Sequence, residues 1–224
     1  MKKRTKLSDR TLPNYTRGEE IMNMVTHIVG GALGITAVTL CVIFAALKGN
    51  VYGVVGSAIF GGFMIATYTL SSVYHGLLPG TGKKVLQILD HCMIYTLIAG
   101  SYTVVALSAL RPLYPTLGWG MFAFQWILAA LCITLNAIDL KKYKIFSHIC
   151  YIFMGWAILP FMPQTIEALT MPGFWLLLLG GISYSVGAIL YGIGSKKRWM
   201  HSVFHIFVVL GSLLQFLCVL FYAI

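Results

Sequence analysis

The sequence has 224 residues, of which 58% are hydrophobic and only 10% are charged, and its mean hydropathy is +0.84. Soluble domains carry about 25% charged residues, so this composition excludes an ordinary soluble protein and indicates an integral membrane protein. The net charge of +10 does not indicate a nucleic-acid partner, because topology and anionic lipid headgroups account for such a charge in a membrane protein.

The chain starts with a basic segment, residues 1–20, which we expect to form a cytoplasmic tail. Thr16-Arg17-Gly18-Glu19 has the spacing of a capping box, the pattern that starts many helices. The apolar run that follows is too long for the core of a signal peptide and lacks a cleavage site of small residues. We therefore expect it to be retained as the first membrane-spanning helix.

Residues 21–224 contain seven mainly apolar windows of about 20 residues, the length that a membrane-spanning helix needs. In chain order they are Ile21–Leu47, Val51–His75, Leu86–Leu110, Leu117–Ile138, Ile145–Met162, Gly173–Ile193 and Met200–Ile224. The fifth is the least regular, because Pro160 and Pro163 interrupt its end. Short connections join the windows, so we expect one all-α domain: a bundle of seven transmembrane helices.

Positive charge is concentrated at one end of these predicted helices. Of the 16 Lys and Arg residues, all but Lys48 and Arg111 fall in the N-terminal segment or in every second connection. Positive charge is retained on the cytoplasmic side. The distribution therefore predicts a cytoplasmic N-terminus, an external C-terminus and a place in the cell membrane.

Three windows carry ionisable residues near their predicted cytoplasmic ends. The second window ends at His75, the third has Asp90 near its start, and the last begins with His201 and His205. Residues four apart lie on one face of a helix, one turn from each other, so His201 and His205 can share one metal ion. The predicted topology brings all these groups to the same depth.

Two interpretations fit this polar layer. In the first, His75, His201 and His205 bind a zinc ion whose fourth position holds water, the ligand pattern of catalytic zinc sites. Asp90 would orient that water and accept its proton, and Ser71, one turn before His75, would support a ligand or polarise a substrate carbonyl. In the second, these groups form only a hydrogen-bonded polar belt at the bilayer interface. Iron or another divalent cation would accept the same imidazoles.

Other polar residues have simpler interpretations. Glu20 and His27 could line the same cavity, although a polar belt accounts for both. We expect His91 and His148 to be hydrogen-bonded interface histidines and Asp139 to be a solvated charge at a helix end. The five cysteines are dispersed and form no CxxC pair, which argues against a disulfide framework or a thiolate metal site. We expect them to be small buried side chains.

Several segments together resemble the hemolysin III family, which is related to the progestin and adiponectin receptors and, more distantly, to the alkaline ceramidases. The resemblance covers about Tyr15 to the C-terminus. Its carriers are Glu19 to His27, Ser71 with Tyr74-His75, Leu89-Asp90-His91 leading to Ala99-Gly100-Ser101-Tyr102-Thr103, and His201-Ser202-Val203-Phe204-His205. Val104 departs from the pattern, because many members have proline there. The short N-terminal segment looks like the bacterial branch.

The resemblance implies a seven-helix protein with a zinc site on the cytoplasmic side. It implies that His75, His201 and His205 are the ligands, with Asp90 acting through water and Ser71 supporting catalysis. In the receptor relatives such a site is described with lipid amide hydrolase activity, so we expect a hydrolase of a membrane lipid amide or ester. Two alternatives stay open: a pore-forming cytolysin, as the family name suggests, and a receptor or stress sensor in which zinc is structural.

Overall fold

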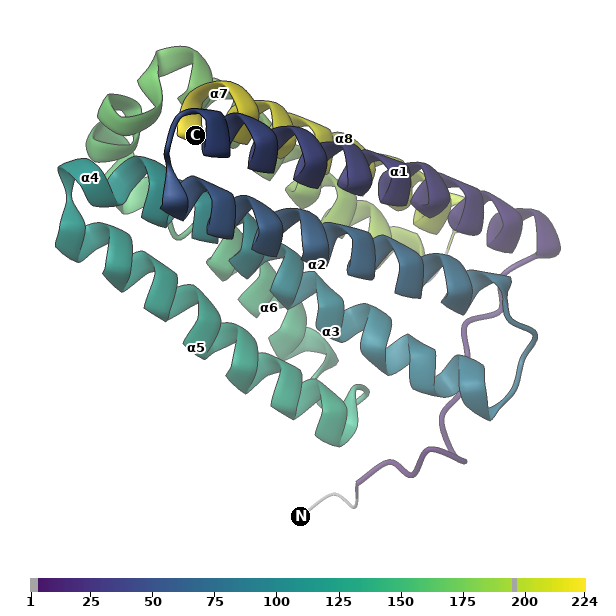
Figure 1. Ribbon diagram of the computed structural model, residues 1–224. Helices are drawn as coiled ribbons and strands as arrows, with labels where there is room; N and C mark the ends of the chain where they lie inside the picture. Colours follow the sequence, from purple (N-terminus) through teal and green to yellow (C-terminus); the bar gives the residue numbers. More distant parts are fainter. Residues whose placement is uncertain (1–3, 195–196) are drawn as a thin grey trace.

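The computed structural model describes residues 4–194 and 197–224, and the regular structure in them is entirely helical (Figure 1). The elements are α1 (Arg17–Leu47), α2 (Val51–Gly76), α3 (Thr81–Val104), the π-helical segment η1 (Val105–Leu110), α4 (Arg111–Leu113), α5 (Pro115–Asp139), α6 (Lys144–Gly155), the 3-10 turn η2 (Leu159–Phe161), α7 (Met162–Gly194), α8 (Met200–Cys218) and the π-helical segment η3 (Val219–Ala223). Lys2, Lys3 and Lys196, which contribute to the predicted charge distribution, lie outside the described residues.

Six stretches of helix within the described residues are long and apolar enough to cross a membrane. One of them, Lys144–Gly194 with 51 residues, covers both the fifth and the sixth predicted window. Its first helix, α6, has only 12 residues, about 18 Å at 1.5 Å per residue, which is shorter than a hydrocarbon core of about 30 Å. The predicted all-helical fold is confirmed. The predicted number of seven membrane crossings is not, because length and composition identify six candidate spans among the described residues.

The irregular backbone between α6 and α7 follows from the prolines in this stretch. Pro160 lies in the 3-10 turn η2, and inside α7 the helix is interrupted at Thr170, where φ is 60° and ψ is 167°, two residues before Pro172. Proline lacks the amide hydrogen that a continuing helix needs. The fifth predicted window, Ile145–Met162, is therefore not one continuous helix. Helix α6 ends at Gly155, and the 3-10 turn η2 follows it.

After this interruption the chain returns along α6. The ring of His148 on α6 stacks on that of Tyr191 on α7, with 5.2 Å between the centroids. Trp156, just beyond the end of α6, donates a hydrogen bond to the Ser185 hydroxyl at 3.0 Å. Residues further along α6 thus meet residues earlier in α7. The two helices are antiparallel over this length.

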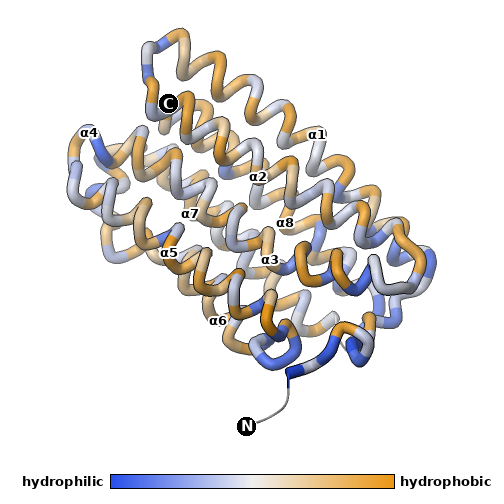
Figure 2. The backbone as a smooth tube through the Cα atoms, turned by 60° about the horizontal axis from the view of Figure 1, so that its bottom comes forward, coloured by the Kyte–Doolittle hydropathy of each residue, from blue (hydrophilic) through white to orange (hydrophobic). Residues whose placement is uncertain are grey.

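The helices enclose a common interior. Helix α1 packs against α2 and α8, α2 against α3, α3 against α5 and α6, and α7 against α8. Figure 2 shows that hydrophobic residues run along the helices, while most hydrophilic ones gather at the two ends of the bundle. All five cysteines are buried and free, as expected for small side chains in the interior. Large apolar side chains such as Ile28 and Ile127 cover the outside.

One carboxylate joins the starts of α1 and α8. The predicted capping box is confirmed: Glu19 accepts hydrogen bonds from the Thr16 amide and hydroxyl, both at 2.8 Å. The same carboxylate accepts one from the Trp199 amide at 2.7 Å. Trp199 precedes α8 in the left-handed conformation with φ 67°, which is unusual for a bulky residue. Glu19 therefore helps to set where α8 begins relative to α1.

The segment before α1 crosses the ends of several helices (Figure 1). The Thr5 amide donates to the Asp139 carboxylate at 2.8 Å, and the amides of Lys141 and Lys142 donate to it at 3.1 Å. Asp139 is only 2% exposed. The expectation of a solvated charge there is wrong, because three backbone donors and the N-terminal segment cover it.

Small residues allow α1 and α2 to approach each other closely, as in many membrane helix pairs. A Cβ atom on Gly61 would lie 2.4 Å from Cβ of Val38 and 2.8 Å from its Cα. A Cβ on the next residue, Gly62, would meet nothing within 4 Å. The contact between the two helices thus depends on Gly61 having no side chain.

We predict that Gly61→Ala destabilises the protein by about 1–3 kcal/mol, because the backbone of α1 has to move away. Gly62→Ala is the matched control. It should be neutral or slightly stabilising, since alanine exceeds glycine in helix stability by roughly 0.5–1 kcal/mol. Thermal unfolding in detergent micelles measures both effects. Equal melting temperatures of the two variants would contradict this account of the α1–α2 contact.

Candidate metal centre

The structure brings together the three histidines expected from the sequence. His75 lies in the last turn of α2, and His201 and His205 lie in the first two turns of α8. One ligand-type nitrogen from each lies within 4.8 Å of the others. All three are buried, with 2%, 8% and 1% exposure respectively. The cluster could therefore hold a single metal ion.

A backbone contact orients His205 on α8. His205 Nδ1 lies 3.2 Å from the carbonyl oxygen of Asn23 on α1. A carbonyl can only accept, so Nδ1 carries the proton and Nε2 keeps its lone pair. That Nε2 faces His201 Nε2 at 3.1 Å. His205 thus presents its lone pair to the centre of the cluster.

His75 is held by a carboxylate. Its Nδ1 lies 2.6 Å from Oε2 of Glu20, and the Asn23 side chain approaches the same nitrogen at 3.4 Å. A carboxylate accepts hydrogen bonds, so Nδ1 donates and Nε2 again keeps the lone pair. His75 Nε2 is fully buried and has no hydrogen-bond partner among the described residues. This nitrogen is available for a ligand.

The donor set fits a metal ion. Histidines that bind metals usually donate their other ring proton to a carboxylate or a backbone carbonyl, and Glu20 and Asn23 provide one of each. A buried nitrogen without a partner, such as His75 Nε2, costs free energy that metal coordination would remove. Imidazole nitrogens suit zinc, and also iron, copper and nickel.

Aromatic rings pack against the cluster from α1 and from the segment before it. Tyr15 stacks on His201 with 4.8 Å between the ring centroids, and His27 stacks on His205 at 3.7 Å. Burial raises the pKa of the Tyr15 hydroxyl, so this ring stays neutral. Both ring nitrogens of His27 are buried and unpartnered among the described residues. These contacts limit how the ligand rings can turn.

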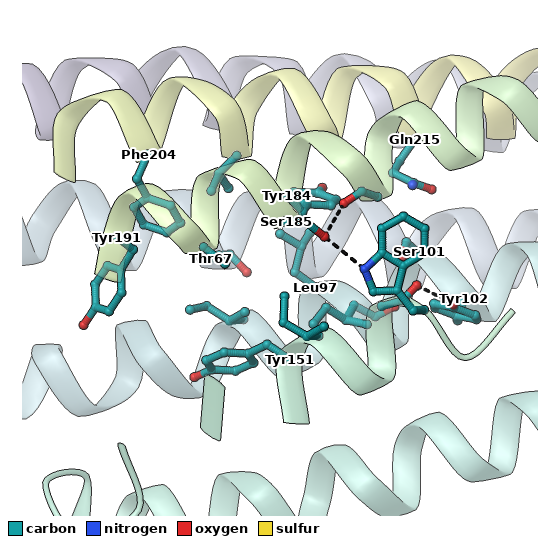
Figure 3. Close-up of a pocket in the computed structure, with 18 of the residues that line it drawn as sticks. Thr67, Leu97, Ser101, Tyr102, Tyr151, Tyr184, Ser185, Tyr191, Phe204 and Gln215 are labelled. Carbon is teal, nitrogen blue, oxygen red and sulfur yellow. Dashed lines mark hydrogen bonds between the residues drawn. The ribbon is translucent and has the colours of Figure 1, made fainter. Parts of the chain in front are cut away.

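The cluster adjoins an elongated cavity of about 160 Å³, lined mostly from α3, α6, α7 and α8 and partly from α1 and α2 (Figure 3). His201 and His205 line one end and Gln215 the other. In Figure 3, Tyr191 and Phe204 lie at the opposite end from Gln215, and both rings contact that of His201. The positions of His201 and Gln215 are about 21 Å apart along α8 at 1.5 Å per residue. Most of the wall between them is apolar.

Asp90 and Ser71 line the same cavity as His201 and His205. The Asp90 side chain is 18% exposed, and Ser71 is 1% exposed. Asp90 Oδ2 approaches His91 Nδ1 at 3.8 Å, which is too long for a hydrogen bond. The carboxylate therefore keeps acceptor capacity on the cavity side.

His91 and His148 are hydrogen-bonded, as predicted. His91 Nδ1 contacts the Gln87 carbonyl at 2.8 Å, and its Nε2 contacts the Tyr191 hydroxyl at 3.1 Å. His148 Nδ1 contacts the Lys144 carbonyl at 2.6 Å. Among the described residues, neither belongs to the histidine cluster. Both also line the cavity.

Lys83 and Tyr15 were not assigned to the cluster from the sequence, and Glu20 was left open between the same cavity and a polar belt. Lys83 was interpreted only as a topological charge, yet it is 4% exposed and its Nζ lies 2.6 Å from Oε1 of Glu20. Glu20 contacts His75 directly, and Tyr15 covers His201. A signal was available for Glu20, because it precedes His27 by two helical turns and so shares its face. No sequence feature near Lys83 or Tyr15 indicates that either residue lies close to the histidine cluster.

We predict that purified wild-type protein carries about one tightly bound metal ion per chain and that His205→Ala loses it, because two imidazoles hold an ion far less well than three. His148→Ala is the control: its imidazole lines the same cavity but lies outside the cluster. Inductively coupled plasma mass spectrometry gives the metal content. Unchanged content in His75→Ala, His201→Ala and His205→Ala would remove the metal centre.

Comparison with known proteins agrees with the resemblance seen in the sequence. The family described as Haemolysin-III related matches residues 15–216. Hemolysin-3 of Bacillus cereus is 40% identical over 206 residues, which cover 92% of each chain. A Hemolysin-3 homolog of Bacillus subtilis (strain 168) is 39% identical over 210 residues, covering 94% of this chain and 97% of the relative. The chain therefore belongs to the haemolysin III family and is a multi-pass membrane protein.

Proposed function

We propose that this protein is a zinc-dependent hydrolase that cleaves an amide or ester bond of a membrane lipid. The observation that carries the proposal is the connection between the histidine cluster and the elongated apolar cavity. His201, His205, Asp90 and Ser71 all line that cavity at its polar end. A reactive polar end joined to an apolar space matches a substrate with a polar linkage and a hydrocarbon chain.

The cavity wall explains why the substrate would be a lipid. Leu97, Leu177 and Val208 line its length between the histidine end and Gln215. Burying a hydrocarbon chain there gains about 25 cal/mol per Å² of apolar surface removed from water. The same wall would exclude a fully polar substrate, whose groups would lose their hydrogen bonds to water. We therefore expect a single hydrocarbon chain to lie along α8.

The residues of the site then have distinct roles. His75, His201 and His205 would hold the zinc ion, which would supply a Lewis acid and make a bound water acidic enough to lose a proton near neutral pH. Asp90, which lines the cavity from α3, accepts a proton from water and returns it to the leaving group. The Ser71 hydroxyl, one turn before His75, donates a hydrogen bond to the substrate carbonyl. Glu20 and the Asn23 carbonyl hold the ligand rings in place.

We further infer seven membrane crossings with the histidine cluster at the cytoplasmic side. The antiparallel contacts of His148 with Tyr191 and of Trp156 with Ser185 support two crossings within Lys144–Gly194. Lys83 and Lys84 in the first turn of α3, and Lys197 and Arg198 before α8, mark the end of the bundle that holds the cluster. Positive charge favours the cytoplasmic side.

A second candidate function is membrane lysis, favoured by the name Hemolysin-3 of the Bacillus cereus relative. Lysis by a pore would not need the metal. A His201→Ala/His205→Ala double variant that folds should then still lyse erythrocytes. Loss of lysis together with the metal would instead assign lysis to lipid cleavage.

We predict that Asp90→Asn keeps its metal but hydrolyses a lipid amide or ester about 10²- to 10⁴-fold more slowly, the usual contribution of a general acid–base group. Glu167→Gln is the control, since Glu167 is an exposed carboxylate bonded to Tyr114 and does not line the cavity. Release of fatty acid from a panel of N-acyl and O-acyl lipids, monitored by mass spectrometry, measures turnover.

Two outcomes of this assay would contradict the hydrolase. One is a zinc-loaded wild-type protein that cleaves no lipid in the panel. The other is turnover that Asp90→Asn leaves unchanged. If wild type shows no turnover but metal removal lowers its melting temperature, the zinc is structural, as expected of a receptor or sensor.

A further inference from the structure

A chain of hydrogen-bonded polar groups links three helices behind His75. Glu20 on α1 contacts His75 Nδ1 through Oε2 at 2.6 Å and Lys83 Nζ through Oε1, also at 2.6 Å. The Lys83 side chain is 4% exposed and the Glu20 side chain 20%. Lysine is almost never buried without a partner. The Glu20 carboxylate therefore bridges two donors, a ring nitrogen and an ammonium group.

Lys83 is fixed by more than this ion pair. Its Nζ also donates to the carbonyl of Leu77 at 2.9 Å and lies 3.5 Å from the carbonyl of His75. These carbonyls belong to the C-terminal end of α2, which ends at Gly76. The last carbonyls of a helix lack intrahelical partners, and a cation there is favourable. Lys83 thus holds the end of the helix that carries His75.

We propose that Glu20 is a positioning residue of the metal centre, which fixes the ring of His75 with its proton on Nδ1, while Lys83 holds the other oxygen of Glu20 and the end of α2. The inference rests on the metal centre of the proposed function. Only this tautomer leaves the lone pair of His75 Nε2 free for an ion. Lys83 Nζ contacts Oε1 of Glu20, which leaves Oε2 to accept the hydrogen bond from His75 Nδ1.

The substitution Glu20→Gln should move the ring proton of His75 from Nδ1 to Nε2. An amide offers one oxygen and one NH₂ group, but both neighbours of residue 20, His75 Nδ1 and Lys83 Nζ, are donors. The charged Lys83 takes the oxygen, because hydrogen bonds to charged groups are the stronger ones. The NH₂ group then faces His75 Nδ1 and stabilises the tautomer whose proton lies on Nε2. That tautomer cannot bind the metal through Nε2.

A second substitution should reverse this effect. Lys83→Met removes the competing donor, so in Glu20→Gln/Lys83→Met the amide oxygen can turn to His75 and restore the Nδ1–H tautomer. Lys83→Met alone leaves the bond between Glu20 and His75 and should mainly lower thermal stability, because the Leu77 carbonyl loses its donor. A purely structural role for Glu20 predicts the opposite, a double variant that is no better than Glu20→Gln.

Asp139→Asn is the matched control. Asp139 is a carboxylate only 2% exposed that accepts hydrogen bonds from the backbone amides of Thr5, Lys141 and Lys142 rather than from a histidine of the cluster. This substitution should lower the melting temperature but leave zinc affinity unchanged. The comparison therefore separates positioning of a ligand from support of the fold.

The test measures zinc affinity by competition with a chelator and the tautomer of His75 by ¹⁵N NMR of histidine-labelled, metal-free protein. We expect Glu20→Gln to bind zinc about 10- to 100-fold more weakly and to shift His75 toward Nε2–H. The double variant should recover most of both properties. Should Glu20→Gln not fold, Glu20→Asp provides a second test, because its carboxylate is too short to reach Nδ1 and should also weaken zinc binding.

Different results overturn different claims. Wild-type zinc affinity and an Nδ1–H tautomer in Glu20→Gln would refute the positioning role and leave the metal centre intact. A double variant that binds zinc as weakly as Glu20→Gln would refute it as well. A wild-type protein that binds no zinc would overturn the proposed function and this inference together.

Discussion

The carboxylate of Glu20 joins three helices at the polar end of the bundle, because it bonds both to His75 at the end of α2 and to Lys83 in the first turn of α3. The neighbouring carboxylate, Glu19, joins α1 to the start of α8 through the Trp199 amide. Polar groups buried in an apolar bundle are costly unless they are paired. The start of α1 supplies these pairs and thereby helps to position the helix ends that carry the histidine cluster.

With this arrangement, the cavity has a polar end at the histidine cluster, and the rest of its wall is mostly apolar. The histidine cluster and Asp90 lie at one end of the cavity, and residues such as Leu97 and Val208 line the way to Gln215. Close approach of α1 and α2 at Gly61 keeps that side of the bundle tightly packed. The cavity is lined mostly from α3, α6, α7 and α8, and also by His27 of α1 and by Thr67 and Ser71 of α2. Helices α1 and α2 thus contribute both close packing and residues of the site.

Much of this could be predicted from residue patterns, because apolar windows define membrane helices and charge sets the depth of polar groups. His75, His201 and His205 were placed at one level in this way. The rotation of each helix about its axis depends on tertiary packing, so the contact of Glu20 with His75 could not be derived. The burial of Lys83 depends on the path of the α2–α3 connection, and that of Asp139 on the N-terminal segment. Neither burial can be inferred from the residues next to Lys83 or Asp139 in the sequence.

X-ray absorption spectroscopy of the zinc-loaded wild-type protein tests the central claim, a metal bound by three imidazoles, most directly. The fine structure should show three imidazole nitrogens at about 2.0–2.1 Å, as in other histidine-bound zinc sites, together with one oxygen ligand and no sulfur. A first shell that contains sulfur, or fewer than three imidazoles, would contradict the assignment of His75, His201 and His205 as the ligands.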